Sequence, residues 1–285
     1  MRKVTNRKRT SGSTLSRFFT AALRWGIIIF WVAFTMLPLY AAFCASLTKY
    51  ENLGKSFLYP ADWQWKNYID VFTRIPLLSF LRATLIYAVG TSLLCVLLGT
   101  FAAYAFSRFR FVGRQTMLTI VFVSQLVPQV IIVIPLFLML RDMHLYDAYL
   151  GVILAIVSTG IAFTVLLLKS FFDGIPLSLE EAAAIDGASR IRILTRVVLP
   201  LSKSGIATAF ALSFFTGWGQ YLYPLILTRQ AANTPVTVGV ARLIDNQTPW
   251  EIVMAATLIS VLPAVVIYMF VQKFLTRGLL LGAVK

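Results

Sequence analysis

The sequence predicts an all-α, polytopic membrane protein with six transmembrane helices. Of its 285 residues, 59% are hydrophobic and 13% are charged, which is about half of the charged share that soluble domains carry. The apolar residues gather in long runs that polar segments separate. Backbone groups in lipid must find hydrogen bonds within their own segment, so the runs predict helices. Their continuous apolar character does not fit the alternating pattern of a membrane β-barrel.

Each expected span follows from one apolar run, because a helix needs about 20 residues to cross a bilayer. The runs cover about 23–47, 79–106, 116–140, 150–168, 204–228 and 252–272. We expect the first run to be a retained span, since it is longer than the 7–15 apolar residues of a cleaved signal peptide. It also contains Pro38.

The distribution of basic residues predicts the orientation of the chain. With the N-terminus inside, most of the 26 Lys and Arg residues fall in the inner segments, and the positive-inside rule then puts both termini in the cytoplasm. We expect three parts: a basic cytoplasmic tail (1–22), a transmembrane domain (23–275) and a cytoplasmic C-terminal tail (276–285). The basic tail suits anionic lipid, and binding of nucleic acid is not expected without a basic folded domain.

The residue types needed for catalysis or metal binding are scarce. His144 is the only histidine and lies in a short outer loop, whereas Cys44 and Cys95 both fall within spans. Two membrane cysteines form neither a disulfide framework nor a metal cluster. We therefore expect no catalytic residue, no cofactor and no metal site.

Buried carboxylates, which ion-driven carriers usually keep, are also missing from the spans. Asp142, Asp147 and Glu251 lie at the rims of the expected spans. If the chain transports a solute, we expect the energy to come from another subunit. Two alternatives remain open from the residues alone: a secondary transporter that works by itself, and a membrane scaffold without transport activity.

The longest inner loop, 169–203, contains a polar, alanine-rich segment. Ser178 and Glu181 have the spacing of a capping box, which predicts a short helix from Leu179 to Asp186. Gly187 would end this helix in the left-handed conformation. Isolated helices below about 12 residues are marginal in water, so another protein surface is needed to hold it, or it is only a solvated connector.

A second short helix is expected from Ser189 to about Val198, with Pro200 ending it. Within the first predicted helix, Ala182, Ala183 and Ala184 have almost no side chain, which would let another protein approach closely. Glu181 would give such a contact a charged anchor.

Two sets of residues within the spans also stand out. A stripe of small residues recurs every four positions and predicts close packing of the fifth span against a neighbour: Gly205, Ala209, Ser213 and Gly217. Amide and aromatic side chains near Pro128 and Pro224 could line a pathway for a neutral, hydroxyl-rich solute: Gln125, Gln129, Trp218, Gln220 and Tyr221. The alternative, which the residues alone favour, is that they form hydrogen bonds between helices and an aromatic belt at the membrane surface.

The inner loop resembles the cytoplasmic EAA loop of permeases from ATP-binding-cassette importers. That motif is Glu-Ala-Ala, three residues, Gly, nine residues, Ile, one residue and Leu-Pro. This chain has Glu181-Ala182-Ala183, Gly187 and Leu199-Pro200 at that spacing, with Val197 in place of Ile. PADWQWKNYIDVF (60–72), AAYAFSRFRFVGR (102–114) and RGLLLGAVK (277–285) resemble the maltose-type, carbohydrate branch of these permeases. The resemblance covers roughly residues 20–285.

The resemblance implies a type I importer permease in the cytoplasmic (inner) membrane of a prokaryote. It implies four kinds of partner: a second homologous permease, two copies of a cytoplasmic ATPase, an extracytoplasmic solute-binding protein and the lipid bilayer. In that family the loop forms a helix that docks on the ATPase, and Glu181 would pair there with a basic residue. The residues expected to couple to the ATPase are Glu180, Glu181, Ala182, Ala183, Asp186, Gly187, Leu199 and Pro200. The expected cargo is a sugar or a sugar derivative.

Overall fold

The structure is a computed structural model and describes residues 14–53, 59–60, 62–245 and 247–283. In these ranges the regular elements are all helices, which confirms the all-α class. Four helices are long and apolar enough to cross a membrane alone: α1 (Thr14–Ser46), α3 (Leu77–Arg108), α6 (Tyr149–Asp173) and α13 (Trp250–Ala283). They correspond to the runs at 23–47, 79–106, 150–168 and 252–272. The basic residues of the first 13 positions lie outside the described part.

The expected third span, 116–140, is not one continuous helix. It consists of α4 (Arg114–Ser124) and α5 (Gln129–Asp142), whose axes differ by 102°. Pro128 is the residue before α5. Proline lacks an N–H group and disfavours the helical conformation in the residue before it, so the backbone leaves the helix between Gln125 and Pro128.

The expected fifth span, 204–228, is interrupted as well. It is divided into α10 (Lys203–Trp218) and α11 (Leu222–Leu227). In a continuous helix the N–H of residue 224 would bond to the carbonyl of Gln220, but Pro224 has no N–H to donate. The Gln220 carbonyl instead accepts a hydrogen bond of 2.7 Å from the hydroxyl of Thr237.

Three helices form the centre of the molecule, where α3 packs along both α6 and α10. The stripe of small residues on α10 makes this contact, as the sequence predicted. A Cβ atom added to Gly217 would lie 2.8 Å from the Cα atom of Ala88 on α3, and one added to Gly205 would lie 2.4 Å from the ring of Phe171 on α6. Ala209 is buried, and the Ser213 hydroxyl hydrogen-bonds that of Thr164 at 3.1 Å.

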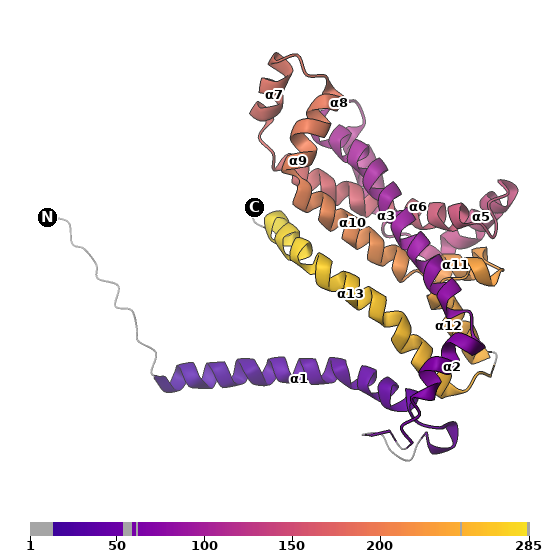
Figure 1. Ribbon diagram of the computed structural model, residues 1–285. Helices are drawn as coiled ribbons and strands as arrows, with labels where there is room; N and C mark the ends of the chain where they lie inside the picture. The colour runs from indigo at the N-terminus through magenta and orange to yellow at the C-terminus, as the bar shows by residue number, and fades with distance from the viewer. Residues whose placement is uncertain (1–13, 54–58, 61, 246, 284–285) are drawn as a thin grey trace.

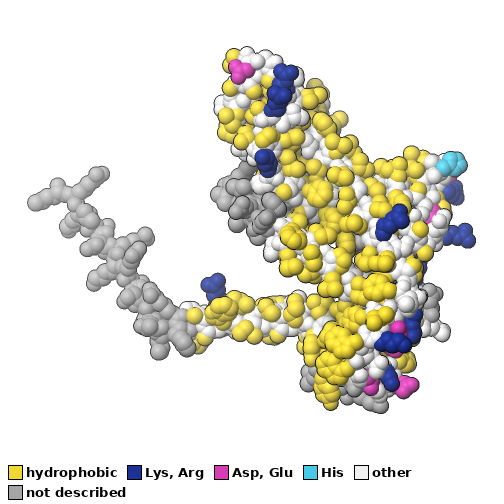
Figure 2. Space-filling view, viewed as in Figure 1, with side chains coloured by type: hydrophobic (Ala, Val, Ile, Leu, Met, Phe, Trp, Pro, Cys, Tyr) yellow, Lys and Arg dark blue, Asp and Glu magenta, His cyan; other side chains and the backbone are white. Residues whose placement is uncertain are grey.

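The two ends of α3 carry different additional helices (Figure 1). At its first turn lie α2 (Lys66–Arg74) and α12 (Val236–Asp245), which share a buried apolar cluster with α13. At its last turn lie α7 (Leu177–Ile185) and α8 (Arg190–Ile193). Hydrophobic side chains cover much of the surface in between (Figure 2), as expected for a surface that faces lipid or another membrane subunit.

The first helix extends away from the rest of the chain (Figure 1). Along its apolar part, Phe19–Ser46, only 6% of the residues in the most apolar window are buried. Phe30, Trp31 and Phe34 pack against one another on its surface and remain more than half exposed. Its main neighbour in the chain is α13.

Candidate functional site

The short helix α7 is anchored to the rest of the chain by a buried ion pair. The Arg108 Nε atom, in the last residue of α3, donates to the Glu180 Oε1 atom at 2.6 Å, and the two side chains are only 6% and 3% exposed. The Tyr104 hydroxyl donates to the other carboxylate oxygen at 3.1 Å. A carboxylate that is buried needs such partners, so Glu180 fixes the position of α7 on α3.

The same arginine ties α7 to the end of α6. Its terminal nitrogen, Nη2, donates to the carbonyls of Phe172 (2.7 Å), in the last turn of α6, and Ile175 (3.2 Å), just beyond its end. Beside it, Asp173 accepts hydrogen bonds of 2.6 Å from Ser107 and from Lys169. One guanidinium group therefore joins three segments: α3, α6 and α7.

The start of α7 differs from the sequence prediction. The helix begins at Leu177 with Pro176 at its N-cap position, and no side chain caps it. The predicted capping box of Ser178 and Glu181 is therefore wrong, because Pro176 starts the helix two residues earlier and leaves Ser178 inside the first turn. Of the two glutamates, Glu180 points into the protein and Glu181 is exposed.

The end of α7 follows the prediction. Gly187 has a φ angle of 81°, in the left-handed region. The N–H of Ala188 donates to the carbonyl of Ala183 and that of Gly187 to Ala184, both at 3.0 Å. These bonds form a Schellman motif. Ala183 and Ala188, which are joined by the first of them, both pack on the buried cluster beneath α7.

The segment after Gly187 is longer and less regular than expected. Ser189 caps α8 by accepting from the N–H of Arg192, but the chain then forms a π-helical turn, η2 (Leu194–Val198), and continues through α9 (Leu199–Leu201). Pro200 therefore does not end the helix. Its missing N–H group is accommodated beside the wider π-helical turn, and the direction changes by 83° at the start of α10.

The outer surface of α7 and α8 carries exposed apolar side chains and has no neighbour within the described chain. Large side chains lie exposed there: Leu177 (56%), Ile185 (87%) and Ile191 (67%). Glu181, Ala182, Asp186 and Pro200 are exposed on the same loop, whereas Ala183 and Leu199 are half-buried. Large exposed apolar side chains next to charged ones are typical of a protein-binding surface.

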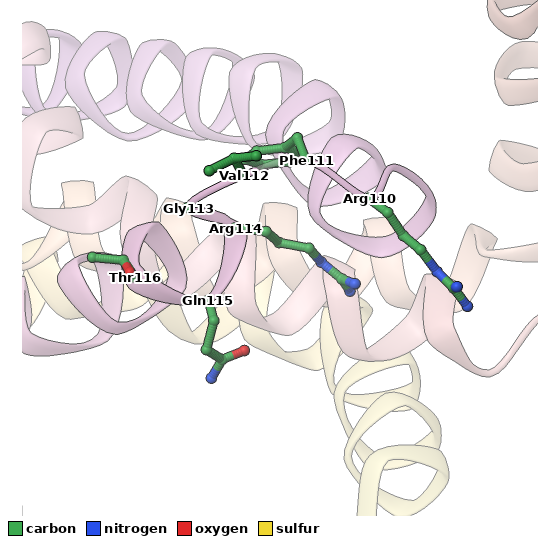
Figure 3. A pocket seen from close by; sticks show the side chains of 7 residues that line it. All are labelled: Arg110, Phe111, Val112, Gly113, Arg114, Gln115 and Thr116. Atoms are coloured by element: carbon green, nitrogen blue, oxygen red, sulfur yellow. The ribbon is translucent and has the colours of Figure 1, made fainter.

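The loop between α3 and α4 reaches α8, which carries part of this surface. Residues 110–116, in this loop and the first turn of α4, line an open hollow of about 670 Å³ (Figure 3). Arg114 Nε donates to the carbonyl of Phe106 at 2.9 Å, and the guanidinium of Arg190 on α8 lies 5.9 Å from the ring centre of Phe109. The loop thus supports α8 through a cation–π contact.

A pocket of about 210 Å³ with polar side chains in its walls lies between α3, α6, α10 and the break between α4 and α5. Gln125 and Gln129, on either side of the break between α4 and α5, line it together with Thr159. The Gln125 side chain donates to the Thr159 carbonyl at 3.2 Å. Thr91, which is fully buried, has a hydroxyl oxygen without a hydrogen-bond partner.

The other three predicted pathway residues do not line this pocket. The ring of Trp218 stacks on Phe214, with 5.7 Å between the ring centres. The Gln220 side chain is buried and accepts from the N–H of Tyr221, while the side chain of Tyr221 is 42% exposed. These three residues lie at the break between α10 and α11, whereas Gln125 and Gln129 lie at the break between α4 and α5.

Among the residues with critical contacts, Arg108 and Tyr104 were not identified as site residues from the sequence. Arg108 is the basic residue at the inner end of an apolar run, which the positive-inside rule already explains. Nothing in the sequence pairs it with Glu180. In the described part of the chain, no group of His, Cys, Asp and Glu side chains is arranged to hold a metal ion.

Comparison with known proteins assigns this architecture to a family. The family model described as "Binding-protein-dependent transport system inner membrane component" matches residues 95–280. The chain is 32% identical over 262 residues to the inner membrane ABC transporter permease protein YcjP of Escherichia coli (strain K12), covering 88% of this chain and 93% of YcjP. It is 28% identical over 265 residues to the sn-glycerol-3-phosphate transport system permease protein UgpE of Brucella abortus (strain 2308), covering 89% and 93%.

Solved structures give the same result. A chain of a bacterial ABC transporter involved in the import of the acidic polysaccharide alginate superposes with a TM-score of 0.77 at 26% identity, covering 92% of this chain and 98% of that one. A second alginate transporter chain, solved in complex with a periplasmic protein that holds an alginate pentasaccharide, superposes with a TM-score of 0.69 at 18% identity. It covers 91% of this chain and 94% of that one, and at this identity it supports the fold alone.

Proposed function

The chain belongs to the family of binding-protein-dependent transport system inner membrane components, and from this membership we propose that it forms half of the translocation pathway of an ATP-driven importer for a sugar or sugar derivative. It is a non-catalytic, inner-membrane subunit. ATP is hydrolysed by a separate pair of cytoplasmic ATPase subunits, a second permease completes the pathway, and an extracytoplasmic binding protein delivers the solute. The relatives named for glycerol phosphate and alginate transport support a sugar-derived cargo.

The proposed topology has six spans, with both termini in the cytoplasm. Four long helices supply four spans, the bent pair α4–α5 supplies the third, and α10 with α11, over the run 204–228, supplies the fifth. The proposed parts remain the N-terminal tail (1–22), the transmembrane domain (23–275) and the C-terminal tail (276–285). The basic residues of the α3–α4 loop and of the α7–α8 segment favour a cytoplasmic location for this end.

The observation that carries the coupling role is the exposed surface of α7 on a buried anchor. A nine-residue helix is too short to be stable alone, and here Arg108 and Glu180 hold it from beneath. Its outer side then presents Glu181, Ala182 and the apolar Ile185 to a partner. We assign the docking contact to these residues and the positioning of the helix to Glu180. The buried sides of Ala183 and Leu199 support the loop from within.

The translocation pathway is proposed to pass the polar pocket at the α4–α5 break. Within the described part of the chain its walls carry amide and hydroxyl groups and no charged side chain, which suits an uncharged group on the solute. A broken helix also leaves backbone carbonyls free to line such a pocket. Gln125 and Gln129 belong to this proposal, whereas Trp218, Gln220 and Tyr221 act as packing residues of the neighbouring break.

Docking can be tested by co-purification of the ATPase with the assembled permease pair. Glu181→Lys reverses the charge of the exposed anchor, and Gly187→Asp adds a negative charge to the exposed turn beside Asp186. Both variants should insert into the membrane normally and yet lose the ATPase. Asp142→Lys, at an exposed acidic residue remote from this loop, is the matched control and should retain it. Full recovery of the ATPase with both loop variants would exclude the docking role.

A further inference from the structure

A pocket of about 420 Å³ lies at the opposite end of α3 from α7, and three arginines surround it. Arg74 comes from the end of α2, Arg229 from the loop that follows α11, and Arg242 from α12. Phe80, in the first turn of α3, lines the same pocket. With a rise of 1.5 Å per residue, this turn is about 42 Å from Arg108, so the pocket is separate from the α7 loop.

The charges around the pocket are not balanced by the residues that line it. Among the residues that the structure describes, its lining contains no acidic side chain. Arg242 is half-buried, and within that same part of the chain its guanidinium donates to neutral oxygen atoms, the Thr234 hydroxyl (3.4 Å) and the Thr228 carbonyl (3.2 Å). A partly desolvated guanidinium without a carboxylate is a strong attractor for an anion.

The other two arginines are also available to an anion. Arg74 pairs with Asp70 at 3.2 Å, but its side chain is 53% exposed, and an exposed pair of this kind contributes little to stability. Arg229 is exposed, and its backbone N–H donates to the Asp147 carboxylate at 3.0 Å. That carboxylate also accepts from the backbone of Gln230, so it is engaged in holding the loop in place.

The walls of the pocket are held rigidly. A Cβ atom added to Gly239 on α12 would lie 2.3 Å from the ring of Phe80, so the absence of a side chain lets the two helices approach closely. Ile75 and Leu243 lie in the apolar cluster beneath the pocket. The site therefore combines a closely packed apolar floor with a rim of guanidinium groups.

We propose that this pocket is an anion-binding site for a carboxylate group. Guanidinium groups bind carboxylates through paired N–H donors, and the apolar floor suits the carbon skeleton that carries the acid. The carboxylate can belong to an acidic solute or to an acidic side chain of the solute-binding protein. Its position on the extracytoplasmic side rests on the proposed function, but its affinity for anions does not.

The first test measures binding of free sugars to the purified transporter complex in lipid nanodiscs. Sodium glucuronate is the charged probe and glucose the neutral one. If the acid comes from the solute, glucuronate binds and glucose does not, and Arg229→Gln weakens glucuronate binding by about tenfold. Arg141→Gln, at an exposed arginine outside the pocket, should have no effect.

The second test measures binding of the solute-binding protein to the same nanodiscs at low and high salt. If the acid comes from that protein, Arg229→Gln and Arg74→Gln each weaken its association by about tenfold at low salt, and high salt removes the difference. Arg229→Lys keeps the charge and should recover part of the loss. The proposal is overturned if neither glucuronate binding nor this association responds to Arg229→Gln and Arg74→Gln. The ATPase still co-purifies in that case if only this inference is wrong.

Discussion

Arg108 and Glu180, 72 residues apart in the chain, form a buried ion pair of 2.6 Å that holds a nine-residue helix on the end of a transmembrane helix. The pair separates two roles within the loop. The inward carboxylate, Glu180, fixes the helix, and the outward one, Glu181, remains free for a partner.

Removal of one member of this pair should destabilise the α7 loop strongly. Arg108→Ala leaves Glu180 as an uncompensated buried charge, which costs on the order of 3–5 kcal/mol. We expect faster proteolysis within residues 174–201 and a lower melting temperature of the purified complex. The double variant Arg108→Ala with Glu180→Ala should be less destabilised than the two single effects added together. Arg110→Ala, at the exposed neighbour in the next loop, is the control, and equal damage by both arginine variants would refute the anchoring role.

Close packing of α10 on α3 predicts that Gly217 cannot accept a side chain. The Cβ atom of Gly217→Ala would lie 2.8 Å from the Ala88 Cα atom, and backbone cannot move aside as a side chain can. We expect a loss of about 1–3 kcal/mol, measured as a lower melting temperature of the detergent-solubilised protein. Gly219→Ala meets its nearest neighbour at 3.4 Å and should melt close to the wild type.

The left-handed conformation of Gly187 predicts a graded response to substitution. With φ at 81°, a β-branched residue is strained, while asparagine adopts this region more readily. Gly187→Val should cost about 1–2 kcal/mol and weaken retention of the ATPase, and Gly187→Asn should retain most of it. Within the described chain, no atom lies within 4 Å of a Cβ added at Gly187, so neither variant clashes with its own fold. Equal loss of the ATPase in both variants would therefore indicate a clash with the partner instead of backbone strain.

The unpartnered hydroxyl of Thr91 predicts a change in transport without a loss of stability. Thr91→Val keeps the shape of the side chain and removes a buried polar oxygen that has no hydrogen bond, so the melting temperature should stay equal or rise. If the pocket binds the solute, uptake should fall. Thr119→Val, on the exposed side of α4, should alter neither quantity. Wild-type uptake by Thr91→Val would remove the pocket from the proposed pathway.

The source of energy gives a further prediction. Uptake should continue when an uncoupler collapses the proton gradient, provided that cytoplasmic ATP is maintained. The spans lack a carboxylate deep in the membrane that could carry a proton. Immediate loss of uptake under these conditions would favour a secondary transporter.

The sequence predicted the features that depend on local chemistry. Gly187 as a helix stop and the small-residue stripe from Gly205 to Gly217 follow from the conformational freedom and size of single residues. The broken spans were harder, because proline alone does not decide between a kink and a break. Pro38 and Pro263 lie inside continuous helices, whereas Pro128 and Pro224 mark breaks.

The ion pair of Arg108 and Glu180 was not predictable from the residues. It depends on which helix ends meet in three dimensions, and a charge at the end of an apolar run has an equally good explanation as a membrane-orientation signal. The capping box failed for a related reason, since Pro176 and Ser178 both offer a helix start and only the fold selects one.

One uninterrupted helix, α3, contributes to both the arginine pocket and the α7 anchor. It has 32 residues and no proline, which makes it a stiff rod of about 48 Å. If it pivoted near its middle by 10°, each end would swing through about 4 Å in opposite directions. If nucleotide binding displaced the α7 anchor on one side of the membrane, the arginine pocket on the other side would therefore move as well, without any rearrangement inside α3.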